Sequence, residues 1–379
     1  MSASTSPSSH ASGSSPSNKR KRTGDDLSND NAEASNSSSK VKIVQSRTLW
    51  LPDGNIIVRA SSRATHPTRT FHMYKVHKFI LAMHCAAFAA LFEGPQMPFE
   101  DASEKHDGVP VMDLPDSPHD VGNFLKALYF PQTQLHAHIS NPFVEGVFFV
   151  FHDSYSGILR LAVKYDASRI RDLVKDVLVM EWPSRIEDWD ALQDTLSKEE
   201  AERETVAPLY PNPGRAIRLG TDCNVPEVLP CAFYDLTRIF DHFYPNCENG
   251  PETRRMDTSA LRPDELRQLL RGRAAMRGWL LQNLEDVEAP STNECDSHSY
   301  TIESWIQARR AEDTFSSDPL KWLRDTIGEC DDLPLDTLCG NCSEFLKGHL
   351  YYLRWTLWVM LPAFFKLKNI VAAGWGEEE

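Results

Sequence analysis

The sequence of 379 residues lacks any apolar run that approaches the ~20 residues needed to cross a bilayer. It also lacks an apolar signal near residue 1, so we expect its eight cysteines to be reduced thiols or metal ligands rather than disulfides. Basic residues are not in excess, since the formal net charge is −14, and this opposes general binding to nucleic acid or anionic membranes. We therefore expect a soluble protein of a reducing compartment, with no direct nucleic-acid partner and no membrane partner.

Catalytic motifs are missing as well. The sequence contains no glycine-rich loop that could cradle phosphates and no Gly-x-Ser-x-Gly. Its acids and histidines show no spacing that pairs them for proton transfer. The one conspicuous histidine is His77, between a strand-like and a helix-like segment, where hydrogen bonding and capping of the turn are commoner than acid–base work. We expect no catalytic residues and no enzyme activity.

Residues 1–40 contain fourteen serines and almost nothing that could form a core, so we expect a disordered tail. Within this tail four basic residues follow one another: Lys19, Arg20, Lys21 and Arg22. A compact basic block in exposed chain is typical of a nuclear import signal, and a chance basic patch is the alternative. We favour import and expect a nuclear protein, with an additional cytoplasmic population left open.

The N-terminal half of the chain is organised around residues 71–93. Residues 71–76 alternate between two faces, as a strand beside a packed layer does. From Ile80 to Phe92 the apolar residues recur at helical spacing, and the small residues 85–87 interrupt them where two short helices can pack closely. This pattern predicts a strand that leads directly into a pair of helices.

Further motifs flank this segment: two strand-like stretches at residues 53–58 and 111–116, a helical one at 121–129, and Leu-Ala-Val-Lys-Tyr-Asp at 161–166. Together with Val76-His77-Lys78, Ile80-Leu81 and Phe88-x-x-Leu91-Phe92, this order of motifs resembles the BTB/POZ domain over residues 43–182. The chain as a whole is similar to fungal BTB proteins that carry a helical C-terminal region.

The resemblance implies an α+β protein: a BTB/POZ-like domain, with a small sheet and helical hairpins, followed by a mainly α-helical domain. We place the disordered tail at residues 1–40, the BTB-like domain at 41–184, a linker at 185–225 and the helical domain at 226–379. Within the BTB-like domain we expect loops at 59–67 and 94–110, and a helix capped by Ser168.

The resemblance also implies self-association through the first strand and the first helices. The expected interface residues are Trp50, Leu51, Asn55, Lys75, Ile80 and Phe88. BTB dimers place a charged pocket at this seam. Lys75 fits its basic position, but Asn55 stands where an acid is expected and Asp53 lies two residues earlier. We expect apolar burial to support a homodimer without that ion pair.

Two segments between the motifs have open interpretations. His136 and His138 form a His-x-His pair that could bind a metal, although a surface loop is the favoured interpretation. The aromatic run at residues 143–151 either fills a groove of the core, which we favour, or forms an apolar patch for a partner.

The C-terminal region opens a helix at Pro263, with acids in its first turn and leucines marking a buried side. Four arginines supply much of its other side: Arg267, Arg271, Arg273 and Arg277. We favour a solvated helix face for this set over an acid-binding role, which stays open.

A Cys-x-x-Cys motif at Cys339 and Cys342 precedes a second leucine-rich helix, and Gly340 permits the turn that brings two thiolates onto one metal ion. Cys295 and His298 offer a second pair with the same spacing, and Cys330 and His349 are spare candidates. These residues are the candidate ligands of a structural zinc site. We favour four unconnected residues over zinc, and we place a redox dithiol last, because it lacks the flanking strand–helix–strand pattern.

These features favour a protein–protein interaction module over an enzyme. The resemblance to BTB domains implies a self-associating scaffold or a transcription-associated cofactor that binds itself and other proteins, transcription factors among them. A substrate adaptor of a cullin-type ubiquitin ligase is the alternative, with a cullin as the partner.

Overall fold

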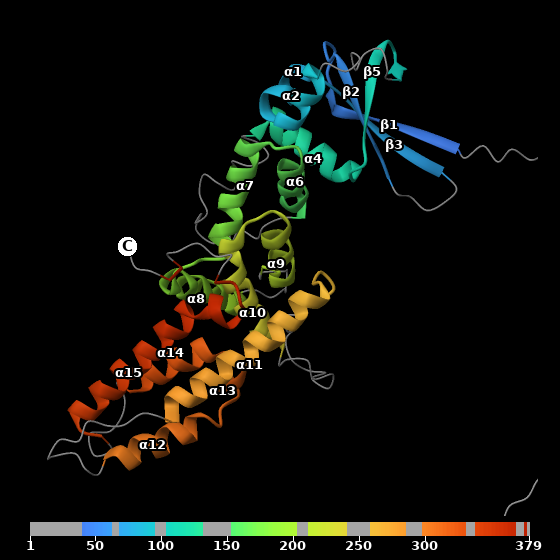
Figure 1. Ribbon diagram of the computed structural model, residues 1–379. Helices are drawn as coiled ribbons and strands as arrows, with labels where there is room; N and C mark the ends of the chain where they lie inside the picture. The colour runs from blue at the N-terminus through green and yellow to red at the C-terminus, as the bar shows by residue number, and fades with distance from the viewer. Residues whose placement is uncertain are drawn as a thin grey trace, which may run out of the picture. The chain divides into compact units, whose positions relative to one another are not determined.

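The computed structural model describes residues 40–62, 68–94, 104–131, 153–202, 211–240, 258–285, 298–330, 338–368 and 375–376 (Figure 1). Residues 41–379 form one compact unit. The expected disordered tail, its basic block at 19–22, the His-x-His pair and the aromatic run at 143–151 lie outside the described residues.

The described strands form one sheet in the order β1-β3-β2-β5-β4. Their bounds are β1 (Lys40–Trp50), β2 (Ile56–Ser61), β3 (Thr68–Val76), β4 (Lys105–His106) and β5 (Val109–Leu114). Strand β2 runs antiparallel to β3, with Ile56 opposite Val76, and parallel to β5, with Ile57 opposite Val111. The strand at 71–76 and the one at 111–116 are thus confirmed, with ends that differ by up to three residues.

The two faces of the sheet follow the alternation of β2. Ile56, Val58 and Ala60 are buried in the large core that includes the helices. Ile57 points to the opposite face, where it packs with Met73 and Val111 in a small separate cluster. Successive side chains of a strand point to opposite faces of the sheet. A strand with consecutive apolar residues is therefore buried on both faces.

The loop expected at residues 59–67 is wrong for its first three residues, which belong to β2. Arg59 looked too polar for a strand. Its guanidinium bridges to Asp113 on β5, with Nε 2.6 Å from Oδ1, and to Glu104 at 2.9 Å. Neutralisation by neighbouring carboxylates lets an arginine occupy a strand position beside the core.

The loop expected at 94–110 is also wrong in part, because its end forms the hairpin of β4 and β5. Asp107 and Gly108 have φ of 50° and 80°, and two successive positive φ values are the mark of a tight two-residue hairpin turn. The Asp-Gly pair in the sequence is the signal that predicts this turn.

Helices form the rest of the described chain (Figure 1). In the first half they are α1 (Lys78–His84), α2 (Ala86–Glu93), α4 (Pro118–Tyr129), α6 (Asp153–Lys164), α7 (Ser168–Glu181) and α8 (Ile186–Glu202). In the second half they are α9 (Pro213–Asp222), the 3-10 turn η2 (Pro226–Val228), α10 (Leu229–Phe240), α11 (Pro263–Glu285), α12 (His298–Arg309), α13 (Asp313–Ser317), α14 (Pro319–Glu329), α15 (Gly340–Val359) and α16 (Leu361–Phe364). None of these described helices is both long enough and apolar enough to cross a membrane.

Residues 185–225, expected as a linker, contain α8 and α9, and both helices pack into the core. Trp189 and Leu196 of α8 are 3% and 2% exposed. Helix α9 begins at Pro213, with the Asn212 side chain accepting a hydrogen bond from the Arg215 amide at 3.0 Å. Proline at the first position of a helix initiates it, so the proline-rich sequence here marks a helix start rather than a linker. The division of the chain into a domain at 41–184 and another at 226–379 stays a prediction.

The C-terminal helices bury the expected leucine stripe of α15, with Leu346, Leu350, Leu353 and Leu357 at 0% exposure. In α11 the predicted stripe is right for Leu269 but wrong for Leu270, which is 44% exposed. The buried side also includes Glu265, whose carboxylate lies 2.8 Å from the Arg218 guanidinium. An acid that seemed only to complement the helix dipole is thus a buried ion-pair partner.

A buried polar network joins α10 to the start of α14. The hydroxyl of Tyr234 donates to Asp318 at 2.6 Å and accepts from the Leu320 amide at 3.0 Å. The Arg238 guanidinium lies 2.6 Å from the second Asp318 oxygen. Burial is the main cause that raises the pKa of Tyr234, and the Asp318 charge adds to it. Buried polar networks of this kind fix the relative register of the helices that they connect.

The overall class is as expected: α+β, with a small curled sheet, helical hairpins beside it and a mainly helical C-terminal region. Ser168 is the first residue of α7 rather than its cap, because the N-cap position falls on Ala167 and carries no side-chain bond.

Candidate interaction surface

The junction between β3 and α1 holds His77 in place from two sides. The Tyr129 hydroxyl accepts from the His77 amide at 2.7 Å and lies 3.1 Å from its Nδ1. On the other side, Nε2 is 3.2 Å from the Asp53 carboxylate. His77 therefore has structural hydrogen-bond partners, but they lie far along the chain rather than locally as predicted, and its side chain does not cap α1.

Asn55 provides the cap that we expected from His77. Its side-chain oxygen accepts a hydrogen bond at 2.8 Å from the amide of Lys78, the first residue of α1. An asparagine oxygen satisfies an amide that has no partner inside the helix, which stabilises the helix start. The asparagine in the place of the expected acid thus has a structural role within one chain.

The charged pocket expected at Lys75 is not formed as an ion pair between described side chains. The Lys75 ammonium donates to the Pro52 carbonyl at 2.8 Å. Asp53 bonds to His77 instead. The pKa of the Asp53 carboxyl is lowered, chiefly by a backbone hydrogen bond and next by the hydrogen bond from His77. The Leu51 amide donates a hydrogen bond to the Lys75 carbonyl at 3.0 Å.

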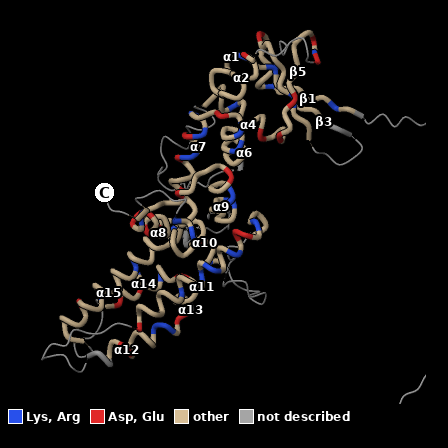
Figure 2. The backbone as a smooth tube through the Cα atoms, viewed as in Figure 1, with Lys and Arg blue, Asp and Glu red and all other residues tan. Residues whose placement is uncertain are grey.

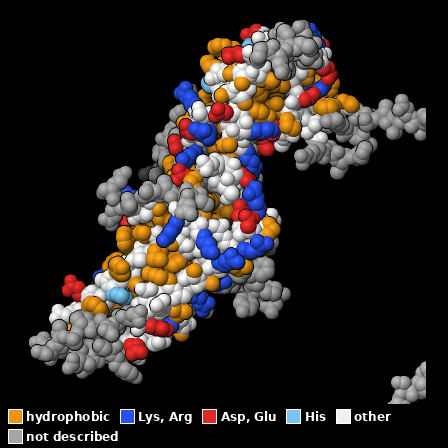
Figure 3. Space-filling model, in the orientation of Figure 1, with side chains coloured by type: hydrophobic (Ala, Val, Ile, Leu, Met, Phe, Trp, Pro, Cys, Tyr) orange, Lys and Arg blue, Asp and Glu red, His pale blue; other side chains and the backbone are white. Residues whose placement is uncertain are grey.

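The surface of α1 and α2 exposes three large apolar side chains, and the sequence spacing singled out only Leu91 among them. Phe79 is 71% exposed and Met83 55% on α1, and Leu91 is 48% exposed on α2. Figure 3 shows hydrophobic side chains gathered over these two helices. We refer to Phe79, Met83 and Leu91 as the α1–α2 patch.

The predicted interface residues divide by burial. Ile80, Leu51 and Trp50 are half-buried, and Trp50 packs on the small cluster beneath the sheet and edge-on to His106. Phe88 is 3% exposed and stacks on Tyr165 with ring centroids 4.7 Å apart. Phe88 therefore faces the core of its own chain and is not available to a second chain. The spacing of apolar residues marks helix faces but does not say which face a neighbouring hairpin covers.

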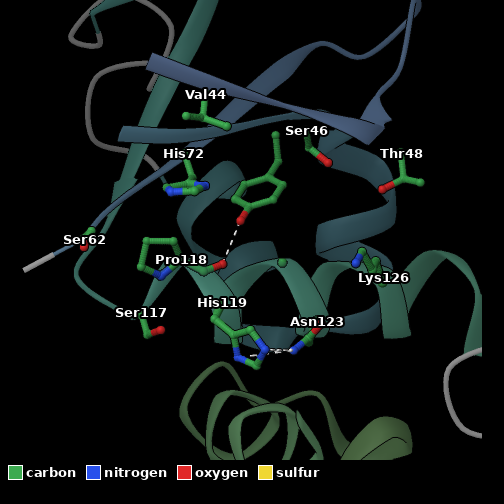
Figure 4. Close-up of a pocket in the computed structure, with 12 residues that line it drawn as sticks. Val44, Ser46, Thr48, Ser62, His72, Ser117, Pro118, His119, Asn123 and Lys126 are labelled. Carbon is green, nitrogen blue, oxygen red and sulfur yellow. Dashed lines mark hydrogen bonds between the residues drawn. The ribbon is translucent and has the colours of Figure 1, made fainter. Parts of the chain in front are cut away.

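A groove lies between β1, β3 and the start of α4, with a volume of about 500 Å³ (Figure 4). One wall is the face of β1 that carries Val44, Ser46 and Thr48, and the floor is α4. Tyr74 crosses the groove and donates its hydroxyl hydrogen to the Pro118 carbonyl at 2.7 Å. Gly122 makes room for this ring, since a Cβ there would stand 3.0 Å from the Tyr74 oxygen.

The chemistry of the groove suits binding rather than proton transfer. None of the twelve described lining residues is an aspartate or a glutamate, and Lys126, His72 and His119 are among them. The His119 ring lies 3.2 Å from the Asn123 amide nitrogen and 3.4 Å from Asp120. No hydrogen bond among these lining residues joins a hydroxyl to an imidazole, so this part of the structure holds no paired nucleophile and base.

The Leu-Ala-Val-Lys-Tyr-Asp motif fixes the hairpin of α6 and α7 to the helices around it. The Tyr165 hydroxyl donates to Asp116, and the Lys164 ammonium lies 2.6 Å from the same carboxylate. Asp166 takes a positive φ of 52°, and its carbonyl accepts from the Ala86 amide at the start of α2 at 3.1 Å. Each polar residue of the motif thus has a structural partner, and burial raises the pKa of Tyr165.

The predicted zinc ligands are only partly within the described residues. Cys339 is the N-cap of α15 and is half-buried, and Cys342 is buried one turn later. Cys330 ends α14 nearby, where its carbonyl accepts from the Ser343 hydroxyl at 3.2 Å. Cys295 and the side chain of His298 lie outside the described residues. Within the described part of the chain, no group of three ligand-type side chains could hold a metal ion.

Zinc binding by Cys295, His298, Cys339 and Cys342 stays a prediction. Elemental analysis of the purified protein tests it, since a structural site holds about one zinc per chain. A content well below one per chain removes the site.

Comparison with known proteins agrees with this geometry. Residues 69–180 match the BTB/POZ domain family, a range that begins in β3 and ends in α7. No curated protein and no solved structure gives a significant match to the chain. The chain therefore contains a BTB domain, which is a protein–protein interaction module and not a catalytic one. BTB domains mediate self-association and binding to other proteins.

Proposed function

We propose that this protein is a self-associating interaction scaffold, in which the BTB domain joins two copies and leaves the C-terminal helices to bind other proteins. The observation that carries the proposal is the α1–α2 patch, whose three apolar side chains are between 48% and 71% exposed. Such side chains on two short adjacent helices favour an interface over a solvated surface.

The free energy of self-association depends on how much apolar area a second chain can cover. Full burial of one large apolar side chain contributes about 1.5–3 kcal/mol, so the patch can supply several kcal/mol before the cost of association. A stable interface covers roughly 800 Å² on each partner, so the patch would form its centre rather than its whole extent. Ile80 and Leu51, both half-buried, would then belong to its rim.

Strand β1 offers a second surface for self-association. It stands at the edge of the sheet, and Val41 and Ile43 are 56% and 48% exposed. An edge strand presents unpaired backbone groups that another chain can extend. Trp50 at the end of β1 anchors the strand to the sheet below.

Two differently tagged copies of the full chain, expressed together, test the proposal. We expect one copy to retrieve the other, and Phe79→Glu with Met83→Glu to abolish retrieval. Met180→Glu is the matched control, because Met180 is also apolar and 46% exposed but lies on α7. Equal retrieval by the double variant and the control contradicts the role of the patch.

We also propose a nuclear, transcription-associated role, supported by the basic block Lys19 to Arg22. Replacing all four residues by alanine in a fluorescent fusion should move the protein to the cytoplasm, and an unchanged distribution makes the block incidental. The alternative function, a substrate adaptor of a cullin-type ubiquitin ligase, would use the same BTB domain. Mass spectrometry of proteins that co-purify with the full chain distinguishes the two, because cullin subunits and transcription factors are readily told apart.

A further inference from the structure

Helix α11 carries basic side chains along its exposed face. Arg267, Arg271 and Arg277 are exposed, and the other exposed residues near them are Leu270 and several small residues. Ala274, Ala275 and Gly278 are all exposed, and a Cβ added at Gly278 would meet nothing within 4 Å. A partner segment can thus approach the helix backbone closely between the arginines.

These arginines differ from most others of the described chain in their partners. Arg218 and Arg324 form ion pairs at 2.5 Å and 2.7 Å with Asp222 and Asp194. For Arg267, Arg271 and Arg277, no ion pair with any described residue is found. The acids of α11 lie at its two ends, where Glu265 binds Arg218 and Glu285 binds Arg310.

The spacing of the arginines makes this arrangement unfavourable for an isolated helix. Arg267 and Arg271 are four residues apart, as are Arg273 and Arg277. Like charges at this spacing face each other on a helix and destabilise it rather than stabilise it. An anionic partner would convert the repulsion between Arg267 and Arg271 into attractive contacts.

The segment after α16 packs against α11 through Phe365 and then carries two exposed lysines. The ring of Phe365 lies against Gly272, where a Cβ would approach it to 2.1 Å, and the Gln268 amide donates to the Phe365 carbonyl. Lys366 and Lys368 follow directly and are exposed. Figure 2 shows basic positions along α11, and Figure 3 shows Lys and Arg side chains gathered over it.

We propose that this face of α11, with Arg267, Arg271 and Arg277, binds an Asp- or Glu-rich segment of a partner protein. Arginine pairs with carboxylates through two parallel hydrogen bonds, and the small residues between the arginines leave space for a peptide backbone. Nucleic acid is the poorer fit, because a chain with net charge −14 repels a polyanion at long range. A short acidic segment experiences mainly the local field of the helix.

Fluorescence anisotropy with the full chain and a labelled acidic peptide of about 15 residues tests the proposal. We expect binding that weakens as salt rises from about 50 to 200 mM, since exposed ion pairs are screened. Arg267→Gln, Arg271→Gln and Arg277→Gln combined should weaken binding at least about 10-fold, because three attractive contacts are lost. A variant with lysine at the same three positions should retain part of the affinity. It separates the contribution of the positive charge from that of the planar guanidinium group.

The matched control removes three positive charges elsewhere: Arg160→Gln, Arg169→Gln and Lys198→Gln, all exposed on α6, α7 and α8. Equal weakening in this control contradicts the proposal, because it reports net charge rather than a site. Absence of peptide binding to the unmodified chain overturns it as well. The proposal is also overturned if a labelled DNA duplex binds more tightly than the peptide and the triple glutamine variant of α11 weakens that binding. The test is independent of self-association, since a variant that cannot dimerise still carries this face.

Discussion

Replacing Tyr165 by phenylalanine removes one hydroxyl from the centre of the BTB motif and leaves the ring in place. The hydroxyl donates to Asp116, whose carboxylate also binds Lys164, and the ring stacks on Phe88. A hydrogen bond to a charged group contributes about 1.5–3 kcal/mol, and Asp116 keeps its lysine partner, so we expect a loss of about 1.5–2 kcal/mol in the free energy of unfolding. Urea unfolding of the full chain, followed by circular dichroism, measures it.

Two further variants separate the hydroxyl from the ring. Tyr165→Ala also removes the stack on Phe88 and should cost about 3–5 kcal/mol, as large-to-small changes in a core do. Tyr352→Phe is the control, because Tyr352 is 59% exposed on α15, and it should stay within about 0.5 kcal/mol of the unmodified chain. A Tyr165→Phe variant as stable as this control refutes the role assigned to the hydroxyl.

Three other predictions concern stability. Gly272→Ala should destabilise the chain by about 1–3 kcal/mol, because its Cβ would stand 2.1 Å from the Phe365 ring, whereas Gly278→Ala on the same helix faces open space and should stabilise it by up to about 1 kcal/mol. Thermal unfolding compares the two, and equal shifts contradict the packing argument. Arg354→Met should cost about 2–3 kcal/mol in urea unfolding, because it removes the 2.5 Å ion pair with Asp190 and the hydrogen bond to the Leu320 carbonyl and leaves Asp190 only Arg324 at 3.8 Å, and a loss below about 0.5 kcal/mol counts against this pair. Burial raises the pKa of Tyr74 and of Tyr155 to about 12, from an ordinary value near 10. The folded state thus holds these protons more tightly, so the stability they contribute is complete below pH 10 and declines as the pH rises towards 12. Phenylalanine at both positions should flatten that decline, and an unchanged pH profile speaks against the two tyrosines as its source.

Sequence patterns predicted the parts of the fold in which one element carries its own signal. The leucines of α15 recur at helical spacing and are buried, and the Lys-Tyr-Asp motif marks a real hairpin. The Asp107-Gly108 pair would have located β4, because few other dipeptides adopt two positive φ values. Signals of this kind depend on the local chain alone.

What the sequence did not predict depends on partners distant along the chain. Arg59 is tolerated in β2 because Asp113 and Glu104 neutralise it, and the acidic helix α8 is anchored through Asp190, whose partner Arg354 lies 164 residues away. Phe88 was predicted to lie at the interface. The hairpin that covers it, through Tyr165, decided the matter. The exposed α1–α2 patch was missed for the same reason, since exposure is set by what packs nearby.

The most direct test of self-association is the mass of the purified chain by light scattering over a concentration series. We expect a mass near twice 42.9 kDa at tens of micromolar, as for a homodimer, and a mass near 42.9 kDa for the Phe79→Glu, Met83→Glu variant. A strictly monomeric mass for the unmodified chain throughout that range contradicts the scaffold.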